Sequence, residues 1–360
     1  MEDHTMETDT STFYDTISDY NVISPKYTPF IFSQAYKNII KYSLVAYPLI
    51  GAIIGISNII TIYAVMRFKH LRSSTNVLIV SLAIADLLNC PALMMLQLNL
   101  YIKVTASNLV YYKTVLGTAS ALQVLSLFMS IINFSLMAVE RFLAVVFPMR
   151  FNAIVTVKKT IIVAVLAWLY GLSIMGIPLV YYMWKALTSS QSGTFYLTEI
   201  LPKPLFIFLF QFHIYFCLAT SCILYISIFI VMKRRAAMFN SHTSDTTMTQ
   251  STKKITQMMF ITLGIFLIIW LPYTITIDLL SELSTQSLAG IIGFYLMLYL
   301  VYSNSFINVF IYAWRSKGFR LAFSKMLCCC KVKHGRQPSS TESATPRQKV
   351  LASGSTQTNM

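Results

Sequence analysis

Charged residues are scarce in this sequence. They make up 11% of the 360 residues, against about 25% in an ordinary soluble domain. Hydrophobic side chains make up 56%, and the mean hydropathy is +0.63, which excludes a soluble or a disordered protein. Of the charged residues, the acidic ones are fewer: the sequence has 13 Asp and Glu and 28 Lys and Arg, which gives a net charge of +15. A basic excess suits nucleic acid or an anionic membrane surface. The hydrophobicity decides for the membrane, so we expect no nucleic-acid partner.

The cysteines lack the arrangement of a disulfide framework. Three lie inside apolar runs and three are consecutive in a basic tail: Cys90, Cys217, Cys222, Cys328, Cys329 and Cys330. Adjacent thiolates do not have the usual spacing of metal ligands. The sequence also shows no other cluster of metal ligands and no nucleophile beside a base. We therefore expect a protein that is not an enzyme and has no cofactor, apart from the cation considered below.

Apolar runs long enough to cross a bilayer occur at seven places. A hydrocarbon core of about 30 Å needs roughly 20 apolar residues per helix, because backbone polar groups cannot be left unpaired in hydrocarbon. The predicted spans are Tyr42–Met66, Asn76–Leu100, Tyr112–Val146, Thr160–Met183, Pro204–Met232, Ile255–Leu280 and Leu288–Trp314. The sequence therefore predicts an all-α membrane protein, a seven-transmembrane helix bundle over residues 42–314.

The basic residues predict the orientation of this bundle. Of the 28, 21 fall on the side that includes the carboxyl terminus and seven on the other. Since cytoplasmic segments carry the excess of Lys and Arg, we expect the amino terminus outside and the carboxyl terminus inside. Residues 1–41 are then an extracellular acidic tail. Residues 331–360, rich in Ser, Thr, Gln and Pro, are expected to be a disordered cytoplasmic tail.

The stretch after the last span is amphipathic. Residues 315–327 carry basic side chains on one side and Phe319 and Phe323 on the other, which is typical of a helix in the membrane interface. We predict a short amphipathic eighth helix and a cysteine cluster over residues 315–330. The thiols at the membrane surface are expected to be palmitoylated; they are Cys328, Cys329 and Cys330.

A few strongly polar side chains lie inside the spans, where burial is costly and usually functional. They are Asn58, Asp86, Ser130, Asn133, Asn304 and Asn308. Hydrogen bonds between helices explain the amides. Asp86 must be neutralised by a proton, a partner or a cation, and no Lys or Arg lies at its depth in any span. A monovalent cation or a proton is the economical answer. A seven-helix ion or solute transporter using Asp86 is the alternative, although the spans offer essentially no further ionisable groups for a path.

Motifs in order along the chain resemble the rhodopsin-like (class A) G-protein-coupled receptors. They are Gly55 to Asn58, Ser81 to Leu87, Glu140-Arg141-Phe142, Trp168, Tyr225, Trp270-Leu271-Pro272-Tyr273 and Asn308 to Tyr312. The resemblance implies a receptor of the plasma membrane that binds an extracellular ligand. It would activate heterotrimeric G proteins by outward movement of the sixth helix, with arrestin and receptor kinases acting on the tail.

The resemblance also implies roles for particular residues. Asp86 would bind sodium with help from Ser130, Asn304 and Asn308, and the ion would favour the inactive state. Arg141 would be held by Glu140 at rest and would contact the G protein on activation. The residues that would relay ligand binding or stabilise the active arrangement are Ile131, Phe266, Trp270, Pro272, Tyr225 and Tyr312.

Several positions depart from the usual pattern of this family. Leu116 replaces a cysteine, and Cys217 and Val309 replace the prolines of the fifth and seventh spans. The first two departures resemble the branch of melanocortin, cannabinoid and lysophospholipid receptors, with adenosine receptors as neighbours; the third fits none of them well. Thr252 stands where an acid commonly holds the arginine of the third span. We therefore expect Arg141 to be held by Glu140 alone and basal signalling to be high.

The predicted ligand pocket is apolar with scattered polar groups. These are Gln97, Gln123, His213, Tyr273 and Tyr302. Gln123 stands where aminergic receptors have an aspartate, and Tyr302 where retinal pigments have a lysine. A weakly charged or lipid-like small ligand fits this composition best. For His213 alone, a structural histidine is the commoner reading.

Overall fold

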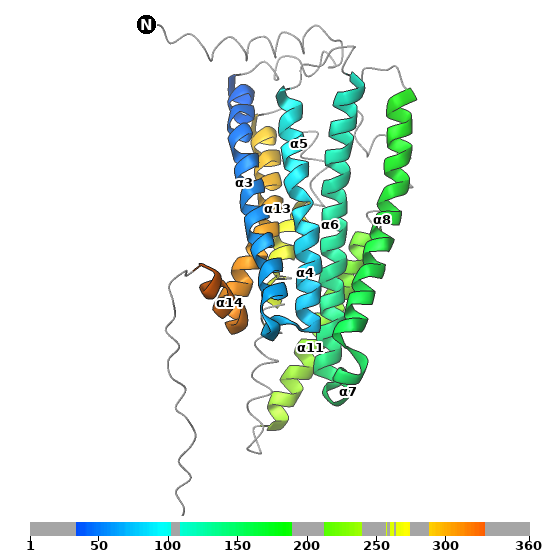
Figure 1. Ribbon diagram of the computed structural model, residues 1–360, viewed down its shortest axis with the longest axis vertical. Helices are drawn as coiled ribbons and strands as arrows, with labels where there is room; N and C mark the ends of the chain where they lie inside the picture. The colour runs from blue at the N-terminus through cyan, green and yellow to red at the C-terminus, as the bar shows by residue number, and fades with distance from the viewer. Residues whose placement is uncertain are drawn as a thin grey trace, which may run out of the picture.

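The computed structural model describes residues 34–101, 109–188, 212–239, 257, 260–262, 264–273 and 288–327. In these residues every regular element is a helix, and the long helices run side by side along one axis (Figure 1). Six of them are long and apolar enough to cross a membrane. A shorter apolar helix, Phe260–Tyr273, falls within the predicted sixth span. The predicted helical bundle is confirmed.

The helices follow the predicted spans closely. Five long helices are α3 (Gln34–Arg67), α6 (Leu109–Val146), α8 (Val157–Thr188), α11 (His213–Phe239) and α13 (Leu288–Arg315). The second span consists of α4 (Ser74–Leu87) and α5 (Asn89–Tyr101), and the short elements are η1 (Lys69–Leu71), α7 (Pro148–Ile154) and α14 (Lys317–Leu327). Helices α3, α8 and α11 extend beyond the ends that apolar composition predicted, because helical backbone continues into the polar flanks.

The second predicted span, Asn76–Leu100, agrees with an observed candidate membrane span, Ser74–Met95, but its helix is interrupted at Leu88. The Leu88 N–H donates a hydrogen bond to the carbonyl of Ala85, three residues earlier, with an N···O distance of 3.1 Å. Pro91 explains the interruption: it has no N–H for the Leu87 carbonyl, and its ring clashes with the carbonyl four residues earlier. The interruption lies between Asp86 and Asn89, which are both buried.

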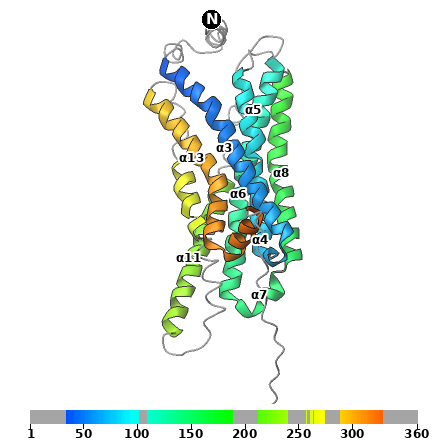
Figure 2. The same cartoon turned by 60° about the vertical axis from the view of Figure 1, so that its left-hand side comes forward.

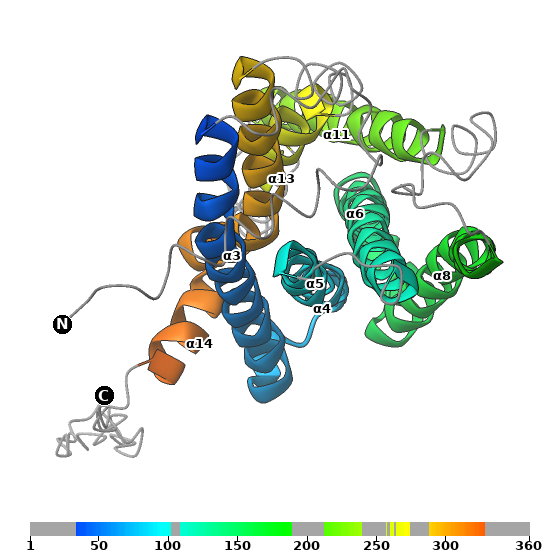
Figure 3. The same ribbon diagram turned by 90° about the horizontal axis from the view of Figure 1, so that it is seen from above.

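Helix α6 is the centre of the bundle. It contacts α4, α5, α8 and α11, and the view along the bundle shows it between these elements (Figure 3). On the other side α3 and α13 pack together, as the turned view shows (Figure 2). Gly171 lets α8 approach α6 closely, since a Cβ atom there would lie 2.5 Å from Met129 Sδ.

Burial is distributed as expected for a bundle surrounded by lipid. Large apolar side chains such as Leu166, Ile226 and Phe229 are exposed on the outer faces of α8 and α11. Polar side chains such as Asn58 and Asn133 are buried between helices. Because water is absent from the hydrocarbon, polar groups gather inside and apolar ones face outward.

Helix α14 buries its apolar side against the bundle. Phe319 and Phe323 are buried, and the Phe319 ring lies 5.6 Å from the ring of Tyr312 on α13. The sequence predicted this helix and its two faces. The apolar face nevertheless packs on protein, which leaves the basic face exposed.

Candidate functional site

Asp86 lies where α4, α6 and α13 meet, with only 1% of its surface exposed. Ser130 Oγ donates to Asp86 Oδ1 at 3.5 Å, and Asn308 Nδ2 donates to Oδ2 at 3.4 Å. Ser305 is buried and lines the same cavity as the carboxylate. Two of the three residues predicted to assist Asp86 therefore contact it directly. The third, Asn304, is buried beside them.

Asn89 joins three helices next to this carboxylate. Its Nδ2 donates to Ser126 Oγ of α6 at 2.9 Å and to Ser305 Oγ of α13 at 3.0 Å. None of these three residues was among the predicted site residues. Spacing was the available signal: Ser126 is four residues before Ser130 on α6, so the two share a helix face, and Asn89 is three residues after Asp86, across the interruption at Leu88.

A cavity of about 120 Å³ connects the Asp86 region with part of the predicted ligand pocket. Its polar and aromatic walls are Asp86, Asn89, Gln123, Ser126, Ser130, Trp270, Tyr273, Tyr302, Asn304 and Ser305. The Asn304 Oδ1 atom is buried and has no hydrogen-bond partner. An acceptor oxygen left unpaired beside a buried carboxylate suits a cation, because hard cations take oxygen ligands. These residues therefore fit a sodium ion.

The opposite end of the cavity carries the Gln123–Tyr302 pair. Gln123 Nε2 donates to the Tyr302 hydroxyl at 2.5 Å, and Tyr47 packs edge-on against the Tyr302 ring at 5.9 Å. Tyr273 lies nearby, with its ring 5.5 Å from that of Trp270. Three of the five predicted pocket residues are thus brought together.

The other two predicted pocket residues are not placed on this wall. His213 begins α11 and packs near the rings of Phe128 and Tyr170, at 6.1 and 5.9 Å. It lies among aromatic side chains of α6 and α8 instead of lining the cavity. Gln97 belongs to α5, and its side chain lies outside the described residues.

Aromatic rings link the cavity to the core. The Trp270 ring stacks on Phe266 at 5.8 Å, and Phe266 lies 4.6 Å from Phe134. Ile131 is buried in the same core cluster. A side chain displaced at the cavity wall would therefore push directly on closely packed rings.

The two tyrosines expected to stabilise the active arrangement, Tyr225 and Tyr312, are buried in that cluster as well. The Tyr225 ring lies 4.8 Å from the ring of Phe260. The Tyr312 hydroxyl is buried without a hydrogen-bond partner. Between the cavity and Tyr312, α13 runs unbroken through Val309, as expected without the proline that would interrupt it.

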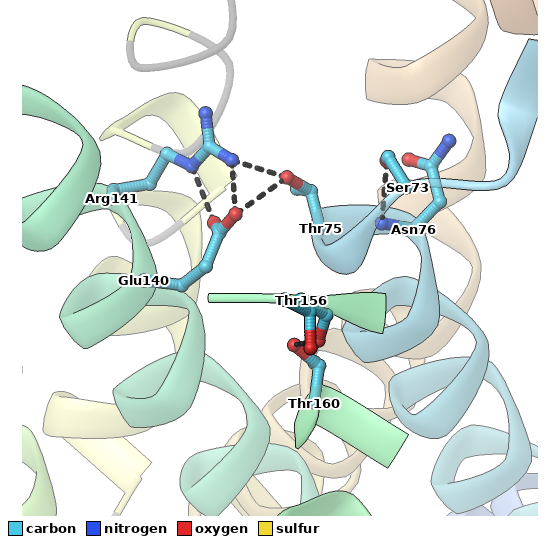
Figure 4. Close-up of polar contacts among 7 residues, drawn as sticks. All are labelled: Ser73, Thr75, Asn76, Glu140, Arg141, Thr156 and Thr160. Carbon is cyan, nitrogen blue, oxygen red and sulfur yellow. Dashed lines mark hydrogen bonds and ion pairs between the residues drawn. The ribbon is translucent and has the colours of Figure 1, made fainter. Parts of the chain in front are cut away.

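Glu140 and Arg141 form an ion pair that is 5% exposed at each residue. Arg141 Nε donates to Glu140 Oε2 at 2.6 Å, and its Nη2 lies 2.5 Å from Oε1. Thr75 of α4 completes the arrangement by accepting from Arg141 and donating to Glu140 Oε1 at 3.0 Å (Figure 4). Thr75 was missed because it lies one residue before the predicted second span and an isolated threonine carries no signal. Thr252 lies outside the described residues.

A short helix, α7, follows α6 at the same end of the bundle. Pro148 begins it, and Lys159 Nζ donates to the Ala153 carbonyl at its end at 3.0 Å. Met149 on this helix is 95% exposed. This exposed apolar side chain lies on the short helix that directly follows α6. Sequence reasoning gave no role to this segment.

Comparison with known proteins agrees with this arrangement. The family model "7 transmembrane receptor (rhodopsin family)" matches residues 57–312. Somatostatin receptor type 2 of Mus musculus is 27% identical over 323 residues, which cover 84% of each chain. Histamine H2 receptor of Cavia porcellus is 26% identical over 288 residues, 79% of this chain and 78% of that one. The bundle, the buried carboxylate, the ion pair and this match have one explanation: the chain is a multi-pass membrane protein that belongs to the rhodopsin family of G-protein-coupled receptors.

Proposed function

We propose that this receptor takes a weakly charged or lipid-like ligand at the Gln123–Tyr302 end of the cavity. The observation that carries this proposal is the cavity itself, which joins that pair to Asp86 past Trp270. Asp86 is the one charged side chain among the described residues of its wall. Recognition by hydrogen bonds and apolar contact therefore suits the site better than an ion pair at its outer end.

Sodium at Asp86 is the second part of the proposal. Ser130, Asn304 and Asn308 would assist the carboxylate, and the unpaired Asn304 Oδ1 supports a cation there. An ion held between α4, α6 and α13 favours the arrangement in which these helices stay together. A ligand that binds better to the arrangement in which these helices separate would lower the population of the sodium-bound arrangement.

The cytoplasmic end would couple to a heterotrimeric G protein. Release of Arg141 from Glu140, with outward movement of the helix containing Phe266 and Pro272, would expose the surface beside Met149. The amino terminus would lie outside the plasma membrane and the carboxyl terminus inside, as the basic residues predict. Arrestin and receptor kinases would act on residues 331–360.

A ligand screen tests the pocket. Cells that express the receptor are exposed to a panel of lipids and metabolites, with histamine and somatostatin included, and G-protein activation is recorded. We expect a lipid or weakly charged compound to act, with a weaker response in Gln123→Ala and Tyr302→Phe. A response only to cationic peptides, lost on changing Asp278 or Glu282, would overturn this preference.

A separate measurement distinguishes the receptor from a transporter that uses Asp86. Purified protein in vesicles is tested for nucleotide exchange on an added G protein and for flux of ions or solutes. Exchange stimulated by a ligand supports the proposal. Flux without exchange would instead favour the transporter.

A further inference from the structure

Six exposed basic side chains lie on the segments that meet at the junction of η1 with α14. We call them the η1–α14 basic surface; they are Arg67, Lys69, Arg72, Lys317, Arg320 and Lys325. Three come from the end of α3 and the turn after it, and three from α14. Two segments far apart in the sequence thus build one surface of a single charge sign.

Close packing holds the two segments together. A Cβ atom on Gly318 would lie 3.0 Å from Leu71 Cδ2, so a larger residue would force α14 away from η1. The Gly318 carbonyl is also 3.5 Å from His70 Nε2. Lys69 and Lys317 each adjoin this contact in the chain, so it brings their backbones near one another.

Two of the arginines are partly fixed by backbone. Arg72 Nη2 donates to the Met66 carbonyl at 2.9 Å, and Arg320 Nη1 donates to the Trp314 carbonyl at 3.0 Å. Each guanidinium caps the end of a membrane helix and keeps further N–H donors. These donors can bind an anion without a large loss of side-chain freedom.

The charge of this surface is not balanced by the described part of the chain. Its only acidic residues are Asp86, inside the cavity, and Glu140, paired with Arg141. Neither reaches the basic surface, so the described acidic residues do not balance its charge.

Apolar side chains adjoin the same surface. Tyr63 and Met66 precede Arg67 on α3 and are more than half exposed, and Leu321 is exposed among the basic residues of α14. Exposed apolar residues directly below basic ones mark the boundary between hydrocarbon and headgroups. A bound anion at this level would adjoin acyl chains.

We propose that the η1–α14 basic surface binds a phospholipid whose headgroup carries several negative charges, a phosphoinositide. Lys69 and Lys317 contact the headgroup phosphates from either side of the Gly318 contact, and the acyl chains lie against Tyr63, Met66 and Leu321. Several basic side chains close together favour a headgroup that carries several negative charges. The apolar side chains beside them favour a lipid over a free phosphate. The location in the inner leaflet rests on the proposed orientation, while the binding itself does not.

The test measures binding of phosphatidylinositol bisphosphate to the full-length receptor in phosphatidylcholine nanodiscs. Their two leaflets are equivalent, so the result is independent of orientation. The variant is Lys69→Gln with Lys317→Gln. Its matched control is Lys158→Gln with Lys233→Gln, two exposed lysines on α8 and α11.

We expect the variant to bind about 30-fold more weakly, since each basic residue near a charged membrane contributes about 1 kcal/mol. The control pair should change binding less than about threefold by the same reasoning. Equal losses in both pairs, or none in either, would overturn the site. Binding of phosphatidylserine or of free inositol trisphosphate as tight as that of the lipid would overturn the assignment of its ligand.

Discussion

Thr75 of α4 donates a 3.0 Å hydrogen bond to Glu140 of α6 and thereby ties the ion pair of α6 to a second helix. The same hydroxyl accepts from Arg141. The arginine is thus restrained by its neighbour and by α4, so the prediction that Glu140 alone holds Arg141 is wrong.

Removing this hydroxyl should loosen the resting state. Hydrogen bonds to charged groups contribute about 1.5–3 kcal/mol, so Thr75→Ala is expected to raise nucleotide exchange without ligand roughly tenfold. The matched control is Thr160→Ala, a buried threonine whose hydroxyl donates to the Thr156 carbonyl at the start of its own helix. Equal exchange in Thr75→Ala and wild type would show that Thr75 does not restrain Arg141.

Asn89 should position the hydroxyls around Asp86 for the cation. The Asn89 amide holds both Ser126 and Ser305. We therefore expect Asn89→Ala to need roughly tenfold more sodium for the same rise in melting temperature, because a loss of about 1.4 kcal/mol in binding free energy weakens affinity tenfold. Thermal unfolding of purified receptor over a sodium chloride series measures this.

Asn133→Ala is the control for that experiment. Asn133 is buried on α6, but its amide bonds the Met129 carbonyl of the same helix and it does not line the cavity. We expect it to lower the melting temperature equally at all sodium concentrations. If wild type shows no sodium response, the cation site itself is wrong; if Asn89→Ala keeps the full response, only the role of Asn89 is wrong.

The contact between α6 and α8 gives a test of packing. Gly171→Val would place methyl groups against Met129 and should destabilise the receptor by about 1–3 kcal/mol, the usual cost of overfilling a core. A Cβ atom at Gly176 on the same helix meets nothing within 4 Å, so Gly176→Val should cost much less. Thermal unfolding in detergent compares them. Similar melting temperatures for the two variants would contradict close packing at Gly171.

The cysteine cluster lies outside the described residues, and its lipidation stays a prediction. Changing Cys328, Cys329 and Cys330 to serine should abolish incorporation of labelled palmitate, because these thiols follow a helix at the membrane surface. Changing Cys222 alone, a partly buried thiol in α11, should leave the label in place. Label retained in the triple variant would place the acylation elsewhere.

The sequence predicted the parts of this molecule that depend on composition and on single polar residues. Runs of apolar residues located the helices, and the cost of burying Asp86 identified the centre of the site. The interruption at Leu88 was also readable from Pro91, since a proline cannot continue the hydrogen bonds of a helix.

Other features depend on which helix faces meet. The hydroxyl of Thr75 matters because α4 lies against Glu140, and Asn89 matters because Ser126 and Ser305 face it from two other helices. His213 shows the converse, since its position among Phe128 and Tyr170 is set by the packing of α11 and of α8 on α6. Spacing along the sequence predicts which residues share a helix face, but it does not predict which other helix packs against that face.

Nucleotide exchange on a purified G protein tests the central claim most directly. Receptor in nanodiscs without ligand should release GDP from the G protein faster than empty nanodiscs do. Arg141→Ala, and Met149→Asp on the exposed face of α7, should each return the rate to that of empty nanodiscs. Exchange no faster than in empty nanodiscs, or a faster rate that both variants leave unchanged, would contradict coupling through this surface.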